Sequence, residues 1–151
     1  MEKPIVKRRE QYSFKTDQNT LVDIFQQFAV NSPKVNIVAV VSKYKNPCVS
    51  VILVVGPDEN DSPVINKIAE NIFDNYNIFY AKNTILDVLN IQVITDTPGA
   101  YLAFYKPLVQ NGIKVLNSYL GEAAAGQVLS AFFDVGACSL NEAEKILEKV
   151  S

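Results

Sequence analysis

The sequence predicts a mixed α/β fold, an α+β sandwich of two ferredoxin-like βαββαβ units. Segments rich in valine and isoleucine alternate with segments whose apolar residues recur at helical spacing. The first half has the order strand, helix, strand, strand, helix, strand, and the order then starts again. The 151 residues are 48 % hydrophobic and 20 % charged, which is typical of a globular chain able to bury a core without metals or disulfides.

The first unit is expected over residues 10–89. Its first strand, over 11–16, leads into a turn and helix N-cap at Asp17 to Asn19. The apolar side of the helix that follows consists of Leu21, Ile24, Phe25 and Phe28. Strands over 35–45 and 48–55 form a hairpin, a second helix begins at Ser62-Pro63, and an extended segment over 85–89 ends the unit.

The second unit is expected over residues 90–151. A strand over 90–95, a helix from Pro98 to about Asn111, and strands over 114–120 and 127–135 repeat the first unit's order. The last helix starts at Ser139, so this unit is expected to lack its final strand. Such an open edge invites pairing with another chain, or the segment Pro4 to Arg9 fills it.

Composition excludes several kinds of function. The chain has no histidine, which removes Ser-His-Asp catalysis and histidine-ligated metal sites. Its two cysteines, Cys48 and Cys138, are far apart and form no paired motif, so no metal and no cofactor are expected. No set of carboxylates and lysines converges at a spacing typical of a catalytic site, and we therefore expect a protein that is not an enzyme.

Charge and hydropathy exclude two kinds of partner. The net charge of −2 argues against nucleic acid, and no apolar run is long enough to span a membrane. The beginning of the chain does not resemble a signal peptide, so a cytoplasmic protein is expected. The one basic cluster, which consists of Lys3, Lys7, Arg8 and Arg9, is interpreted as a charged edge strand or a tail.

The second half resembles an ACT domain, a regulatory module that binds small molecules. The resemblance lies in residues 91–100, followed by 112–119 at the distance that the family shows. Four positions match the family pattern: Asp96, Pro98, Gly99 and Gly112. The first half resembles a degenerate copy, because Asp17 to Thr20 lacks the Pro-Gly pair while Val35 to Ile37 fits the entry into the second strand.

The resemblance implies a free-standing tandem ACT protein that acts in allosteric regulation. ACT units commonly pair side by side into one eight-stranded antiparallel sheet with helices on one face. Their ligand is often an amino acid at the interface between two units. The implied partners are therefore a small molecule, and either a second copy of the chain in a homodimer or an enzyme.

The resemblance also implies a set of ligand-binding residues in the loop after the first strand and at the start of the second strand. A glycine there lets backbone approach a ligand, and N–H groups at a helix start suit a carboxylate. Asp96 either accepts a bond from an ammonium group or, like Thr97, only caps the helix. The expected ligand-binding residues are Asn19, Thr20 and Asn36 in the first unit, and Asp96, Thr97, Pro98, Gly99, Ala100, Lys114 and Asn117, with Ser118 as an alternative, in the second.

A second function remains open at this point. Lys114 stands where many ACT domains have asparagine, and the first half has lost the Pro-Gly pair. Both departures favour a protein-interaction subunit that regulates a metabolic enzyme and keeps only a vestigial ligand pocket. An RNA-binding module of the same topology would need aromatic residues on its central strands, whereas residues 48–55 are aliphatic.

Overall fold

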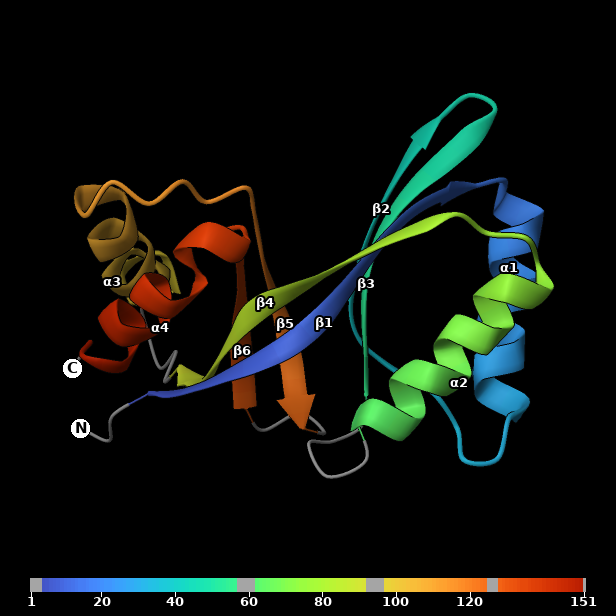
Figure 1. The fold of residues 1–151 in the computed structure, drawn as a ribbon, viewed down its shortest axis with the longest axis horizontal. Coiled ribbons are helices and arrows are strands. Elements are labelled where there is room, and N and C mark those ends of the chain that lie inside the picture. Colours follow the sequence, from blue (N-terminus) through green and yellow to red (C-terminus); the bar gives the residue numbers. More distant parts are fainter. Residues whose placement is uncertain (1–3, 57–61, 92–96, 125–127, 151) are drawn as a thin grey trace. The chain divides into compact units, whose positions relative to one another are not determined.

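The computed structural model describes residues 4–56, 62–91, 97–124 and 128–150. Within them lie six strands and four α-helices, shown in Figure 1. The elements in chain order are β1 (Ile5–Thr16), α1 (Gln18–Val30), β2 (Asn36–Lys45), β3 (Cys48–Gly56), α2 (Ser62–Asn75), β4 (Tyr80–Ile91), α3 (Thr97–Gln110), β5 (Asn117–Ala124), β6 (Val128–Asp134), a 3₁₀ turn (Ala137–Ser139) and α4 (Leu140–Glu148). No helix in the described part is long and apolar enough to cross a membrane.

The six strands form one sheet in the order β2-β3-β1-β4-β6-β5. The pairs β1/β3, β2/β3, β4/β6 and β5/β6 are antiparallel. The predicted fold class, an α/β protein with antiparallel ferredoxin-like units, is therefore confirmed.

The chain forms two compact units. Residues 10–82 make one, which we call the inserted unit. The residues up to Arg9, together with those from Asn83 onward, make the other, which we call the split unit. Strands β1 and β4 are 12 residues long, and each contributes one part to each unit. Because β1 and β4 are each shared, six strands are enough for two four-stranded units, whereas the resemblance implied eight strands.

Two expected boundaries differ from the structure. One strand, β4, covers residues 80–91, whereas the sequence predicted an extended segment over 85–89 and a separate strand over 90–95. Residues 92–95 of that second strand lie outside the described residues. The strand expected from Lys114 begins instead at Asn117. Lys114 therefore lies in the connection between α3 and β5 and not at the start of a strand.

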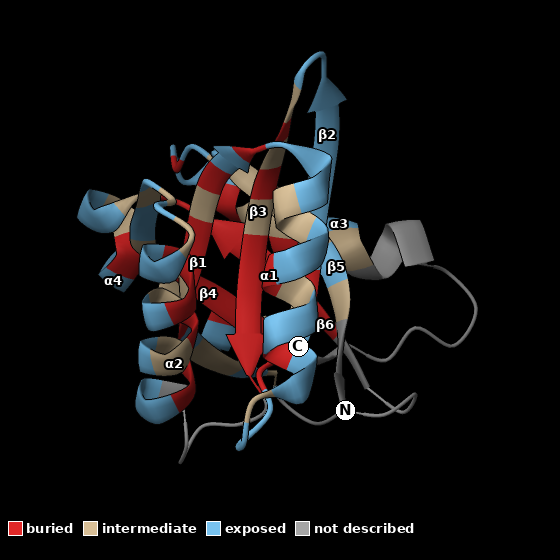
Figure 2. Ribbon diagram, turned by 90° about the vertical axis from the view of Figure 1, so that its right-hand side faces the viewer, coloured by how far each residue is buried: buried red, intermediate tan, exposed pale blue. Residues whose placement is uncertain are grey.

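The core of the inserted unit lies between its strands and helices α1 and α2. Figure 2 shows α2 over β1 and β4, and α1 over β3 on the side of β2. The predicted apolar side of α1 is confirmed, because Ile24 and Phe28 are buried and Leu21 and Phe25 pack against the same core. Alternate residues of β1 and β3 face these helices; they are Tyr12, Phe14, Val49, Val51, Leu53 and Val55.

The core of the split unit is completed by the beginning of β1. Its buried residues come from β4, α3, β6 and α4, and include Leu86, Phe104, Leu108, Phe133 and Leu147. Val6 of β1 packs against this core. The sequence offered the segment Pro4 to Arg9 as a strand for the open edge of the second unit. These residues are part of the split unit, and their strand β1 is a neighbour of β4 in the sheet.

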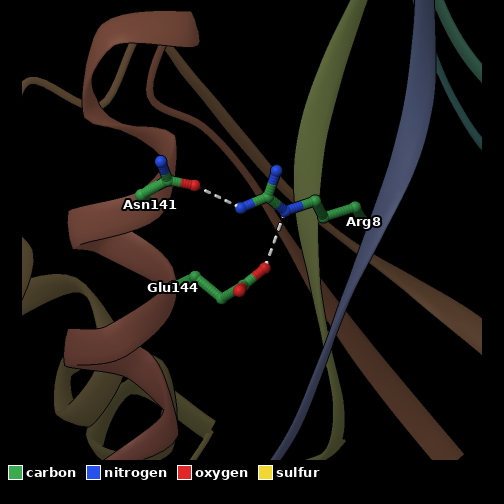
Figure 3. Close-up of polar contacts among 3 residues, drawn as sticks. All are labelled: Arg8, Asn141 and Glu144. Carbon is green, nitrogen blue, oxygen red and sulfur yellow. Dashed lines mark hydrogen bonds and ion pairs between the residues drawn. The ribbon is translucent and has the colours of Figure 1, made fainter.

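Two arginines of β1 attach it to the split unit. Arg8 bonds to two residues of α4 (Figure 3). Its Nε donates to Glu144 Oε2 at 2.8 Å, and its Nη2 donates to Asn141 Oδ1 at 2.6 Å. Arg9 donates from Nε to Asp87 Oδ2 on β4 at 2.6 Å. The exposed fractions of the Arg9 and Asp87 side chains are 7 % and 0 %.

The interpretation of the basic cluster as a tail is wrong for its described members, because Lys7, Arg8 and Arg9 belong to β1. The described pairs between β1 and β3 run from Tyr12 to Thr16 and do not reach these three residues, so the edge-strand alternative stays a prediction. Lys3 lies outside the described residues.

We expect Arg9→Met to lower the free energy of unfolding by about 3–5 kcal/mol, because the Asp87 carboxylate would stay buried without a counter-charge. Adding Asp87→Leu should recover most of that loss, since an apolar pair needs no compensation in the interior. Arg8→Met removes a half-exposed ion pair and should cost less than about 1 kcal/mol. Urea unfolding followed by circular dichroism measures all three. Equal losses for Arg9→Met and Arg8→Met would contradict the role given to the buried pair.

Candidate functional site

The structure describes only part of the Asp-x-Pro-Gly motif. Thr97, Pro98, Gly99 and Ala100 form the first turn of α3, as the sequence predicted. Asp96 lies outside the described residues.

The corresponding turn of the inserted unit is described fully. Asp17 is the N-cap of α1, as predicted, and accepts from the backbone N–H of Thr20 at Oδ1 (2.8 Å). The Thr20 hydroxyl donates to Asp17 Oδ2 at 2.7 Å. These two hydrogen bonds from Thr20 lower the pKa of the Asp17 carboxyl from its ordinary value, and the backbone bond contributes more than the hydroxyl bond. The cap therefore carries a negative charge, which favours an ammonium group, beside the exposed side chain of Asn19.

Asn36 and Lys114 occupy equivalent positions in the two units. Each follows a buried residue, Val35 or Ile113. The N–H of Val35 donates to the Phe28 carbonyl and that of Ile113 to the Leu108 carbonyl, both at 3.0 Å. The local structure differs, because Asn36 begins β2 whereas Lys114 precedes β5 by three residues. The exchange of an amide for an ammonium group adds a chemical difference between these two exposed sites.

Asn117 and Ser118 have partners inside the split unit. Asn117 Nδ2 donates to Asp134 Oδ2 at 3.2 Å across the β5/β6 pair. The Ser118 hydroxyl is hydrogen-bonded to the Tyr101 hydroxyl of α3. A ligand would have to displace or extend these contacts, so both residues are weaker candidates than Asn36 or Lys114.

The expected residues lie in two groups at opposite ends of the first helix of each unit. Asn19 and Thr20 are in the first turn of α1, and Asn36 comes after its last turn. Thr97–Ala100 and Lys114 are related in the same way to α3. Helices of 13 and 14 residues rise about 20 Å. Each unit therefore holds its two groups of candidate residues at opposite ends of a helix.

Comparison with known proteins gives structural matches only. No family model matches the sequence, and no curated protein matches it. Protein BT0572 from Bacteroides thetaiotaomicron has a TM-score of 0.68 at 12 % identity, over 97 % of this chain and 89 % of that one. The regulatory subunit of aspartate kinase from Thermus thermophilus, in its ligand-free form, has a TM-score of 0.60 at 10 % identity, over 99 % and 97 %. This chain has an ACT-type fold.

A third match is a larger protein. Aspartate kinase from Clostridium acetobutylicum has a TM-score of 0.57 at 14 % identity, over 96 % of this chain but only 33 % of that one. The ACT-type fold is thus found both as a subunit and as a part of a longer chain. Identities this low show a shared fold and nothing about the ligand.

Sequence reasoning missed a buried polar group in the split unit. Asp87 of β4 and Ser130 of β6 lie on the same sheet face, because Asp87 is opposite Phe132 and Ser130 is opposite Leu89. Burial raises the pKa of Asp87 above its ordinary value, although Arg9 opposes this. Asp87 Oδ1 and Ser130 Oγ are buried, and the geometry of the described residues gives neither atom a hydrogen-bond partner. The signal in the sequence that could have indicated this group was an arginine and an aspartate in two expected strand regions, Arg9 and Asp87, which are 78 residues apart.

A second buried polar group lies in the inserted unit. The Tyr12 hydroxyl donates to Glu70 Oε2 at 2.6 Å, and Lys82 Nζ donates to the same oxygen at 3.0 Å. Burial and the Glu70 carboxylate raise the pKa of Tyr12, so its hydroxyl stays protonated. This group joins β1, α2 and β4 and is a structural contact. No group of three or more potential metal-ligating acidic or cysteine residues occurs in the described part of the chain.

We expect Asp17→Ala to lower the melting temperature at neutral pH, because it removes the cap of α1. The pKa of Asp17 is lowered in the folded protein, so its charge stabilises the fold above the ordinary value of 3.8. That stabilisation is lost as the pH falls through the lower folded-state pKa, and the difference from wild type should then shrink. Thermal unfolding at pH 7 and well below 3.8 measures this. Asp23→Ala, in the middle of α1, is the matched control, and an equal effect for it would contradict the capping role.

Proposed function

We propose that this chain is a non-catalytic regulatory protein that binds an amino acid or a similar small metabolite. The observation that carries the proposal is the fold match with the aspartate kinase regulatory subunit over 99 % of this chain and 97 % of that one. Binding would stabilise one arrangement of the units over another, and the difference in affinity between arrangements is the source of any signal.

The chemistry of the candidate residues suits a ligand that carries both an ammonium group and a carboxylate. The Asp17 cap at the start of α1 offers a carboxylate to an ammonium group. Asn36 offers an amide that both donates and accepts, and Lys114 offers a positive charge to a carboxylate. The ligand-binding residues proposed from the resemblance, including Asp96 and Thr97–Ala100, complete this set. Lys114 stands in the split unit where Asn36 stands in the inserted unit. We therefore propose that the two units prefer different ligands.

A protein-interaction subunit with a vestigial pocket is the second candidate. Phe79, between α2 and β4, has an exposed fraction of 96 %. Exposed aromatic side chains are frequent anchors of protein interfaces. A metabolic enzyme would then be the partner, and the chain would regulate it by docking.

A thermal-shift screen of the twenty amino acids and common biosynthetic intermediates tests the first candidate. A ligand at about 100 times its dissociation constant adds about 2.7 kcal/mol of stability. For a chain of this size the melting temperature should rise by roughly 5–10 °C. Asn36→Ala should then weaken binding about tenfold, the loss of one hydrogen bond. Asn71→Ala, at an exposed position of α2, is the matched control and should bind as wild type does.

A flat screen would contradict amino-acid binding and favour the second candidate. In that case a Phe79→Ala variant should lose an enzyme partner that wild type recovers in stoichiometric amounts. Equal recovery by wild type and Phe79→Ala would contradict the docking role of Phe79.

A further inference from the structure

The sheet of the inserted unit has a face that points away from α1 and α2. In β1 and β3, Phe14 and Val51 face the helices, and the residues that alternate with them therefore face the other way. On this other face, Lys15 of β1 is level with Ser50 of β3, and Ser50 is level with Lys43 of β2. Three neighbouring strands thus place two lysines on either side of a serine.

A third lysine and a valine extend the same face along β2. Lys45 is two residues after Lys43 and pairs with Cys48, at the end of the β2–β3 hairpin that reaches past the end of β1 in Figure 1. Val41 is two residues before Lys43, and its exposed fraction is 42 %. Side chains two residues apart on a strand point to the same face, so these residues belong together.

Phe79 lies at the start of β4 and points to the same side of the sheet. Ile78 and Tyr80, the residues before and after it, both pack against the core on the helix side. Phe79 therefore points away from the helices, and its exposed fraction of 96 % leaves the ring open to a partner. Because β4 is a neighbour of β1, this ring lies on the side of β1 that is opposite to β3. We call the following residues the lysine face: Lys15, Val41, Lys43, Lys45, Ser50 and Phe79.

The charges of the lysine face are all of one sign. Lys15, Lys43 and Lys45 are exposed, and no ion pair in the described part of the chain includes any of them. The side chains between them, Ser50 and Cys48, carry no charge. Three positive charges therefore gather on one surface of a chain whose net charge is −2. A local excess of positive charge attracts an anionic partner.

The spacing of the lysines suits an extended acidic segment. Lys43 and Lys45 are two positions apart on a strand, which is about 7 Å, and carboxylates at alternate positions of an extended segment have the same spacing. Lys15 is two strands away from Lys43, at about 10 Å. Sites for small molecules are concave, whereas these lysines lie on an exposed sheet surface. A segment of a larger molecule fits this arrangement better than a small anion.

The chemistry of the central strands favours a protein segment over a nucleic acid. Single-stranded nucleic acids stack their bases on aromatic side chains. At the level of the lysines, the residues that β1 and β3 place on this face are not aromatic; they are Ser13, Lys15, Ser50 and Ile52. Phe79 is an aromatic group beside the central strands, and an exposed aromatic ring is a frequent anchor for an apolar residue of a protein partner.

We propose that the lysine face docks an extended acidic segment of a partner protein, with its carboxylates on the three lysines and an apolar residue on Phe79. This proposal deepens the second candidate function and rests on the docking role given there to Phe79. Exposed ion pairs add little affinity, so the contact with Phe79 supplies most of the binding. The lysines select acidic segments and speed their approach.

A library of random dodecapeptides displayed on phage tests the chemistry of the partner, with the whole chain as bait. The recovered peptides should contain acidic residues at alternate positions together with an apolar residue. A selection that recovers no peptide would overturn the proposal, and so would recovered peptides without an excess of aspartate and glutamate.

Fluorescence anisotropy with a recovered peptide shows which side chains contribute to binding. Phe79→Ala should weaken binding by about 30-fold, the loss of a hot-spot contact. Lys43→Glu with Lys45→Glu should weaken it by about 10-fold at low salt and remove most of its salt dependence. Lys67→Glu with Lys106→Glu makes the same change of net charge at exposed positions of α2 and α3, and this control should bind as wild type does. All five positions are exposed, so circular dichroism should show an unchanged fold.

Three results of the binding measurement would also overturn the proposal. They are equal binding by wild type and the Lys43→Glu/Lys45→Glu variant, an equal loss in the control, and tighter binding of a thymidine oligonucleotide than of the peptide. The last result would identify nucleic acid as the partner. If Phe79→Ala loses an enzyme partner while no acidic peptide binds, the docking role of Phe79 stands and the acidic segment is wrong. A hit in the amino-acid screen together with no bound peptide would leave the first candidate function standing.

Discussion

The pair of Arg9 and Asp87 decides which strand completes the split unit. Removing both charges from water is costly, and the cost is offset only because the two groups are 2.6 Å apart. Both residues belong to the split unit, although 78 positions separate them in the sequence. The pair therefore favours β1 as the neighbour of β4.

The sharing of β1 and β4 follows from their length. A strand of 12 residues is long enough to serve the inserted unit with one part and the split unit with the other. Each unit then has four strands and two helices, although the described residues contain six strands. Among the described strands, β2 and β5 are the two ends of the sheet.

Local patterns in the sequence were enough for the helices and for most strands. The apolar residues of α1 and the cap at Asp17 were predicted because each depends on neighbours within one or two turns. The beginning of β1 was left open between an edge strand and a tail, since three consecutive basic residues are compatible with either until their partner Asp87 is known. The unbroken β4 was missed for a related reason. Its continuity depends on pairing with β6 and on the sharing of the strand between two units, neither of which is visible in residues 85–95.

The candidate site shows the same limit of local information. Sequence position correctly put Thr97–Ala100 at a helix start and Asn36 at a strand start, but it could not show that such positions lie at opposite ends of a helix. The side chains also have uses that no motif reveals, as in the mutual hydrogen bonds of Asp17 and Thr20 or of Asn117 and Asp134. Within the inserted unit, Asp17 and Asn19 offer a carboxylate and an amide at the start of α1, whereas Asn36 follows the other end of that helix. Any regulation by such a ligand requires that it bind one arrangement of the protein more tightly than another.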